Sequence, residues 1–186
     1  MILPIVAYGD PVLKKRAEDI EADSENLQVL IRDMWDTMYD AAGVGLAAPQ
    51  VGRSVRLFMV DASPFEEDDA SLADFKKIFI NPQIIEESGN PWKFNEGCLS
   101  IPTIREDVER QPVVRIAYLD EEFNQQEETF EGIAARIIQH EYDHLEGVLF
   151  TDRISPLKRK LLKRKLTEIS RGNVDVKYKM KFPVKR

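Results

Sequence analysis

The amino-acid sequence predicts an α+β fold: small, mainly antiparallel sheets packed around a central metal-binding helix, with a further helix near the C-terminus. Two observations predict this class. Short segments rich in β-branched and aromatic residues alternate with segments of helical apolar spacing, and one helical segment holds both histidines of the chain. No repeat or domain linker interrupts the 186 residues, which are enough for a buried core. We therefore expect one domain over residues 1–186.

The first predicted helix covers residues 24–40, with Ser24 as its expected cap. Its apolar residues recur at helical spacing, in a stripe made of Leu27, Leu30, Ile31, Met34 and Met38. The segment that follows, residues 41–52, consists mainly of glycine and other small residues. It is too rich in glycine for a helix, so we expect a loop or a short extended stretch.

Three strands are expected after this segment, because β-branched and aromatic residues are concentrated there. They cover residues 54–61, 77–85 and 112–120. An acidic, turn-rich segment, residues 62–75, separates the first two strands. We expect this segment to form an exposed, mobile loop, and the sequence assigns it no function.

The C-terminal part is expected to contain a basic helix over residues 155–172 and a tail over residues 173–186. Ser155 is a suitable N-terminal cap, Pro156 fits the first helical position, and Gly172 ends the pattern. The tail alternates weakly, so it is expected to be either a short strand or disordered. Two Lys-Arg-Lys runs on the helix allow two interpretations, a solvated face or a surface that docks on ribosomal RNA phosphates.

The composition restricts the classes of function that the whole surface can serve. A net charge of −7 argues against general binding of DNA or another polyanion, although a local patch can differ from the total. A single cysteine excludes an intrachain disulfide framework and fits a reducing compartment. The sequence shows no secretory-signal pattern and no apolar span long enough for a membrane, so we expect a soluble, cytoplasmic protein.

The second predicted helix, about residues 131–145, carries the strongest functional signal. His140 and His144 are four positions apart, so they lie on one face of such a helix. They continue the apolar row of Ile133 and Ile137, which places them inward. Chance placement of the only two histidines four apart is about a one-in-a-hundred event, which favours a metal site over ordinary core histidines.

Glu141, directly after the first histidine, is expected to face inward as well. A buried carboxylate is destabilising unless a positive charge compensates it, and a divalent cation would supply that charge. Metal coordination lowers the pKa of a bound water to about 7, and a nearby glutamate can take and pass on its proton. The opposite face of the helix, formed by Arg136, Asp143 and Glu146, is expected to be exposed to water.

A catalytic metal site that keeps a position for water needs a third protein ligand. One class of proteases supplies it in the pattern H-E-x-x-H-x-x-G-x-x-H, but Phe150 stands at the last position here and no other histidine exists. A second class uses a downstream glutamate, for which Glu168 is the candidate. The upstream candidate is Cys98, which follows Gly97 in a context that could end a strand facing the helix. The residues alone leave the last two candidates open.

Three short motifs, in their order and separation, resemble the signature motifs of peptide deformylases: GVGLAAPQ at residues 43–50, EGCLS at 96–100 and QHEYDH at 139–144. The resemblance extends over nearly the whole chain. It implies the metal ligands Cys98, His140 and His144. It also implies one divalent ion per chain, most often iron(II), with zinc, nickel or cobalt able to occupy the site.

The reaction implied by this resemblance is hydrolysis of the N-formyl group from the starting methionine of new polypeptides, with release of formate. Glu141 would transfer the proton, while the Gln50 amide and the Leu99 N–H would stabilise the oxyanion. The residues expected to contact the substrate are Gly43, Val44, Gly45, Gly97, Arg105 and Ile137.

Most of these residues have an expected role in binding the substrate. Gly43 and Gly45 let the backbone pass close to the peptide, which can pair with it as an added strand. Val44 and Ile137 are expected to form walls of an apolar methionine pocket. Arg105 either contacts the peptide backbone or is an ordinary solvated arginine.

Two other functions remain open at this point. A zinc peptidase that uses Glu168 predicts that Cys98→Ser is tolerated and that Glu168→Ala is not. A ribosome- or RNA-associated module with a structural metal predicts that Glu141→Ala leaves function intact, because that residue would not be a ligand.

Overall fold

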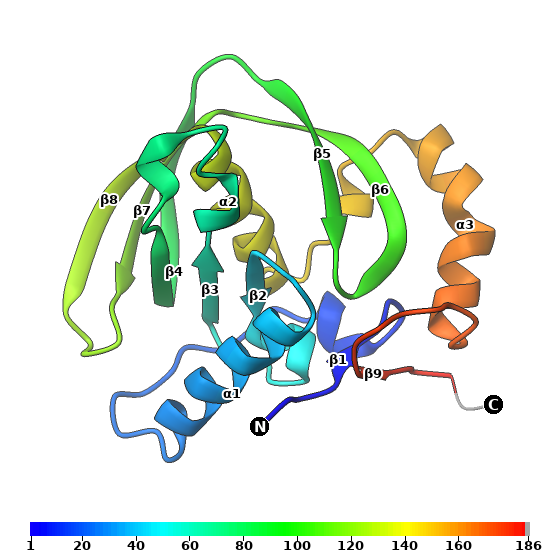
Figure 1. Cartoon of the computed structure of the whole chain (residues 1–186), viewed down its shortest axis with the longest axis horizontal. Helices are drawn as coiled ribbons and strands as arrows, with labels where there is room; N and C mark the ends of the chain where they lie inside the picture. The colour runs from blue at the N-terminus through cyan, green and yellow to red at the C-terminus, as the bar shows by residue number, and fades with distance from the viewer. Residues whose placement is uncertain (185–186) are drawn as a thin grey trace.

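The computed structural model describes residues 1–184, and its largest sheet has five antiparallel strands (Figure 1). Their order is β2 (Gly45–Ala47), β3 (Leu57–Asp61), β4 (Lys76–Ser88), β7 (Val113–Leu119) and β8 (Gln125–Glu131). The remaining strands form an antiparallel hairpin, β5 (Trp92–Cys98) with β6 (Ile101–Arg110), and a parallel pair, β1 (Ile5–Val6) with β9 (Met180–Lys181). The α-helices are α1 (Leu27–Asp40), α2 (Gly132–Leu145) and α3 (Pro156–Ser170). The predicted α+β class with mainly antiparallel sheets is confirmed.

Helix α2 lies between the five-stranded sheet and the β5–β6 hairpin (Figure 1). On the sheet side, Ala134 and Ile138 are buried in one apolar cluster with Phe79. On the hairpin side, Arg136 donates hydrogen bonds to the backbone carbonyls of Trp92, at 2.7 Å, and Val108, at 2.8 Å. The helix that carries both histidines is therefore covered from two sides.

Of two predicted helix starts, the one near the C-terminus agrees with the structure and the first one does not. The first helix begins at Leu27 rather than at Ser24, because Asn26 adopts a left-handed backbone conformation with φ of 66°. Its predicted stripe does face inward, since Leu27, Ile31, Met34 and Met38 are buried. The C-terminal helix starts as predicted, with Ser155 as its N-cap and Pro156 in the first turn.

The three predicted strands correspond to β3, β4 and β7. The prediction omits β5, β6 and β8, whose sequences are rich in charged and amide side chains that are depleted in strands. Strand β6 nevertheless buries one face, because Ile104 and Val108 pack into the core while Arg105 and Asp107 between them are exposed. Buried and exposed positions therefore alternate along β6, but only a few apolar residues mark the buried face of the strand in the sequence.

The acidic segment 62–75 contains regular turns that a simple loop would lack. Two short 3-10 helices form there, η3 (Ser63–Phe65) and η4 (Ala70–Leu72). Leu72 is buried, whereas Glu66, Glu67 and Asp68 are exposed, as expected for the acidic side chains. The apolar residues of the segment anchor it to the core, so the prediction of a plain loop is incomplete.

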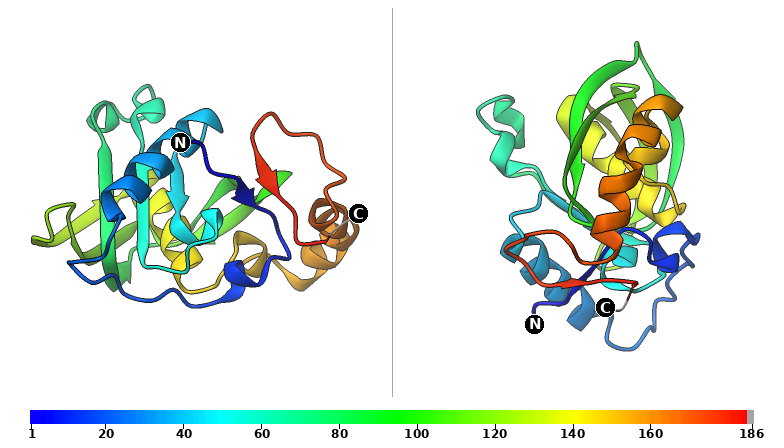
Figure 2. Two further views of the ribbon diagram at one scale, coloured as in Figure 1. Left: turned by 90° about the horizontal axis from the view of Figure 1, so that it is seen from below. Right: turned by 90° about the vertical axis from the view of Figure 1, so that its right-hand side faces the viewer.

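Of the two alternatives for the tail, the short strand is correct. The N–H groups of Ile5 and Ala7 donate to the carbonyls of Lys179 and Lys181, each at 2.9 Å. Figure 2 shows β1 and β9 side by side, although they come from opposite ends of the chain. The last part of the predicted tail, residues 185–186, lies outside the described residues. None of the helices within residues 1–184 is long and apolar enough to cross a membrane.

Candidate metal centre and active site

Three potential metal ligands converge from two elements. Cys98 stands at the end of β5, and His140 and His144 lie on α2. Their ligand atoms all lie within 4.8 Å of one another, and Cys98 Sγ is 3.4 Å from His144 Nε2. Helical spacing brings the two imidazoles together, with ring centroids 5.2 Å apart, and the hairpin brings the thiol to them. The group could hold one metal ion.

Glu141 is buried beside this group, with 5% of its surface exposed. Its Oε2 atom has no hydrogen-bond partner among residues 1–184. Burial raises the pKa of Glu141 to about 7. A buried carboxylate oxygen without a partner is destabilising, and a nearby cation would compensate it. This orphan oxygen and the sulfur-nitrogen-nitrogen donor set both fit a divalent transition metal.

Glu96, which is buried on β5, orients His140. Its Oε1 lies 2.9 Å from His140 Nδ1, so Nε2 is the ring nitrogen left to face the ligand group. Arg110 donates to the same carboxylate at 2.8 and 3.0 Å, and Arg136 does so at 2.7 Å. Burial alone raises the pKa of Glu96, but hydrogen bonds from His140 and Arg110 outweigh it and hold the pKa far below its usual range. The position of Glu96 inside the EGCLS motif is the one sequence signal that points to it.

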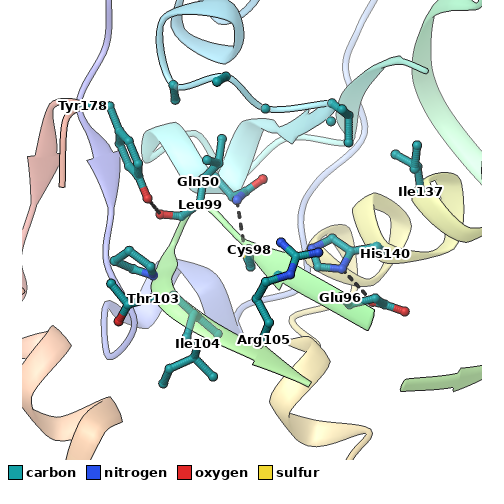
Figure 3. Close-up of a pocket in the computed structure, with 18 of the residues that line it drawn as sticks. Gln50, Glu96, Cys98, Leu99, Thr103, Ile104, Arg105, Ile137, His140 and Tyr178 are labelled. Atoms are coloured by element: carbon teal, nitrogen blue, oxygen red, sulfur yellow. Dashed lines mark hydrogen bonds and ion pairs between the residues drawn. The ribbon is translucent and has the colours of Figure 1, made fainter. Parts of the chain in front are cut away.

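The ligand group opens into a cleft of about 750 Å³ (Figure 3). Most of the residues predicted to serve the reaction line it, namely Gly43, Val44, Gly45, Gln50, Gly97, Cys98, Leu99, Arg105, Ile137, His140 and Glu141. His144 is buried behind them and is not part of the lining. The sheet contributes Gly45 of β2, the hairpin contributes residues of β5, β6 and the turn between them, and α2 contributes Ile137, His140 and Glu141.

Two hydrogen-bond donors lie next to Cys98. Gln50 Oε1 accepts a bond from the N–H of Ala47 at 3.0 Å, which turns its amide nitrogen towards Cys98 Sγ, at 3.5 Å, and Ser100 Oγ, at 3.3 Å. The backbone N–H of Leu99 has no acceptor within residues 1–184. A side-chain amide and a free backbone N–H are the kinds of donor that stabilise an oxyanion.

A sequence profile of the family described as Polypeptide deformylase matches residues 2–160. This chain belongs to the polypeptide deformylase family. It is 60% identical over 190 residues to the peptide deformylase of Christiangramia forsetii, an alignment that covers 98% of this chain and 97% of that relative.

Solved structures of the family have the same fold. The peptide deformylase of Legionella pneumophila superposes with a TM-score of 0.79 at 42% identity, covering 90% of this chain and 95% of the other. The peptide deformylase of Synechococcus elongatus, solved in complex with actinonin, has a TM-score of 0.78 at 40% identity, covering 88% of this chain and 87% of the other. The resemblance inferred from the three motifs is therefore confirmed.

The prediction of an exposed face on the metal-site helix is wrong for this deformylase. Arg136 is 2% exposed and Asp143 is 6% exposed, because the β5–β6 hairpin covers this side of α2. Asp143 accepts hydrogen bonds from Arg110, at 2.9 Å, and from Arg153. Only Glu146, near the helix end, is partly exposed as predicted. Arg110, Arg136, Asp143 and Glu96 form a buried ionic network next to the ligand group, which Glu96 joins through His140.

Neither of the other two positions considered for the third ligand belongs to the ligand group. Phe150, which stands where another protease class has its third histidine, stacks on the His140 ring with centroids 6.1 Å apart. Glu168 lies on α3, where it is 3.6 Å from Arg171, and it is not among the residues that line the deformylase cleft. Neither residue belongs to the group of ligand atoms described above, so Cys98 is the remaining candidate.

Arg105 lines the cleft and is held there by hydrogen bonds to Asn95. Its Nε donates to Asn95 Oδ1 at 2.7 Å, and its Nη2 donates to the Asn95 carbonyl at 3.0 Å. A Cβ atom on Gly97, its partner across the hairpin, would lie only 2.6 Å from Arg105 Nη1. The glycine therefore leaves room for the guanidinium, and an oriented arginine of this kind can contact a peptide in the cleft.

We expect Glu96→Gln to weaken metal binding about 10–100-fold, the range typical for a group that orients a ligand. It should also lower the free energy of unfolding by about 3–5 kcal/mol, because Arg110 and Arg136 would stay buried without their carboxylate. Metal titration and urea unfolding measure the two effects. Glu127→Gln, which breaks an exposed pair with Arg115, is the matched control and should change neither by much. Unchanged metal affinity for Glu96→Gln would contradict an orienting role.

We expect Gly45→Ala to lower kcat for deformylation about 100-fold, since displacements near 1 Å can have effects of that size. The added Cβ would lie 2.6 Å from Glu141 Oε1, so the carboxylate would have to move. Gly132→Ala is the control: no atom lies within 4 Å of its added Cβ, but its φ of +60° makes alanine unfavourable. That variant should lose stability and keep its kcat. A Gly45→Ala enzyme with normal kcat would show that Glu141 need not lie against β2.

Proposed function

We propose that this chain hydrolyses the N-formyl group of the starting methionine of newly synthesised polypeptides and releases formate. The observation that carries the proposal is the arrangement of Cys98, His140 and His144 beside a buried Glu141 whose Oε2 has no partner among the described residues. Membership of the deformylase family and the donor pair in the same cleft support it.

In this proposal Cys98, His140 and His144 hold one divalent ion, iron(II) in the first instance, with zinc, nickel or cobalt as possible replacements. When bound, such an ion would supply Lewis-acid chemistry, which would lower the pKa of the attacking water and polarise the substrate carbonyl. Glu141 takes a proton from the attacking water and delivers it to the departing amine, a role that needs its carboxylate within reach of both. Its raised pKa, caused by burial, would fall when a cation is present, which favours the proton-accepting form.

The remaining residues of the cleft bind the substrate and stabilise the charge that develops on its formyl oxygen. The Gln50 amide and the Leu99 N–H would donate to that oxygen, and losing one such donor typically costs about 3–4 kcal/mol of transition-state stabilisation. Val44 and Ile137 would contact the methionine side chain. The backbone around Gly43 and Gly45 would pair with the peptide, and Arg105 and Gly97 would border it.

The direct test is formate release from a formyl-methionyl peptide by protein loaded anaerobically with iron. We expect release from the formyl peptide and none from the matched acetyl-methionyl peptide, since a methyl group would crowd the ligand group. Absence of formate with a fully metal-loaded wild type would overturn the proposed function.

Cellular placement is part of the same proposal. A reaction on newly synthesised chains places the protein in the cytoplasm, near the ribosome. The basic side chains of α3 are exposed, as are Leu157 and Leu161 on the same helix, so docking on ribosomal RNA stays a prediction for this helix. Ribosome co-sedimentation at two salt concentrations, with Lys-to-Glu variants of α3, tests it; identical binding by the variants would exclude this helix as the contact.

A further inference from the structure

The C-terminal segment, residues 173–183, returns to the cleft after α3. Asp175, Val176, Lys177 and Tyr178 line the cleft that also contains the ligand group. The family match ends at residue 160, so this segment lies beyond the part of the chain that the profile describes. The sequence assigns the segment no role, yet the structure makes it one wall of the cleft.

Tyr178 is the residue of this segment that is hydrogen-bonded to Leu99. Its hydroxyl donates a hydrogen bond to the backbone carbonyl of Leu99 at 2.7 Å. Figure 3 shows Tyr178 and Leu99 together on one side of Cys98, with Ile137 on the other side. The side chains of Tyr178 and Leu99 both pack against a buried apolar cluster that contains residues of α1 and β2, such as Met38 and Leu46.

The segment that carries Tyr178 is anchored to the core through β1. Strand β9 begins two residues after Tyr178 and pairs with Ile5 and Val6. Just beyond β1, the N–H of Tyr8 donates to the carbonyl of Ser100 at 2.8 Å. The turn between β5 and β6 is therefore held at two consecutive carbonyls, one bonded by the tail and one by the N-terminal segment.

This arrangement bears on the Leu99 N–H, which has no acceptor among the described residues. The Leu99 N–H and the Leu99 carbonyl lie on the two peptide planes that meet at its Cα, so bonds that hold the carbonyls of Leu99 and Ser100 limit the movement of this Cα and therefore the position of the N–H. An oxyanion donor is effective only when it is aimed before the charge develops. A rotating turn would lose that advantage, whereas a turn held by Tyr178 keeps it.

We propose that Tyr178 is a positioning residue for the Leu99 N–H, and that the C-terminal segment completes the active site. The inference rests on the proposed deformylase reaction. Tyr178 touches neither the formyl group nor the metal ligands in this role; it acts through the backbone of Leu99. Its effect should therefore appear in the transition state and leave ground-state binding of the peptide nearly unchanged.

The test is Tyr178→Phe in the full-length, metal-loaded protein, since this change keeps the ring and removes only the hydroxyl. We expect kcat to fall about five- to tenfold while KM changes less than about twofold, with the same metal content as the wild type. Tyr118→Phe is the matched control, because the hydroxyl of Tyr118 on β7 donates to Glu128 on β8, and neither residue lines the cleft. That variant should keep kcat within about twofold.

The possible outcomes separate this inference from the proposed function. If Tyr178→Phe keeps a normal kcat per folded, metal-loaded molecule and only its thermal midpoint falls, Tyr178 is merely structural and the inference is overturned. A rise in KM alone would also overturn it, because the tail would then serve only as a wall. If the wild type releases no formate at all, the proposed function fails first.

Discussion

Replacing Glu141 by alanine should lower kcat for formate release about 10²–10⁴-fold while the protein keeps its metal, since general acid-base catalysis contributes in that range. The carboxylate is buried beside the ligand group, and its Oε2 has no other partner among residues 1–184. Glu96, the other glutamate that lines the cleft, cannot replace it, because it is bonded to His140 and to arginines. Initial rates and metal per chain, measured on one preparation, give the result.

The matched control is Glu168→Ala, which removes a glutamate of α3 that lies away from the cleft. It should leave kcat and metal content unchanged. A zinc peptidase that used Glu168 would instead lose its metal and its activity in the control. If Glu141→Ala kept full activity, the chain would be better described as a binding module with a structural metal, and the proposed mechanism would be wrong.

The second large effect is expected for Cys98→Ser. A serine hydroxyl stays protonated at neutral pH, whereas a thiolate is a strong ligand for transition metals. We expect metal affinity to fall by more than about 100-fold, beyond the range for orienting groups such as Glu96, and formate release to be lost with the metal. The chain has one cysteine, so no second thiol can compensate.

Competition with a chromophoric chelator measures the affinity of Cys98→Ser directly, without relying on activity. Ser71→Ala, at an exposed hydroxyl of the acidic segment, serves as the control and should bind metal normally. A Cys98→Ser protein that bound metal like the wild type would mean that the third ligand is elsewhere. The coincidence of Cys98 with two buried histidines would then be structural only.

The helical part of the site could be predicted because its signal is local. His140, Glu141 and His144 are neighbours on one helix, and a period of 3.6 residues alone places the two histidines on the same face. The family motifs added Cys98, Gln50, Gly43 and Gly45, and the structure brings these residues to one cleft. Helical spacing and short motifs can both be read from a few neighbouring residues, so both could be used before the structure was known.

The burial of the other face of α2 could not be predicted in the same way. Arg136 and Asp143 look like a solvated face because a helix on a sheet normally buries one stripe. The hairpin covers the second side, and its strands escaped prediction because charged residues occupy their outer positions. The buried Arg136 donates hydrogen bonds to the carboxylate of Glu96 and to two backbone carbonyls, and only the folded hairpin supplies these acceptors.

The sequence by itself determined the family and the fold class and pointed to the candidate ligand group, since motifs and helical spacing act over a few residues. Only the tertiary structure decided what supports them. Glu96 reaches His140 across 44 positions, and Tyr178 reaches the carbonyl of Leu99 across 79. Contacts over such separations depend on how sheet, hairpin and tail close around α2, and no local pattern encodes that closure.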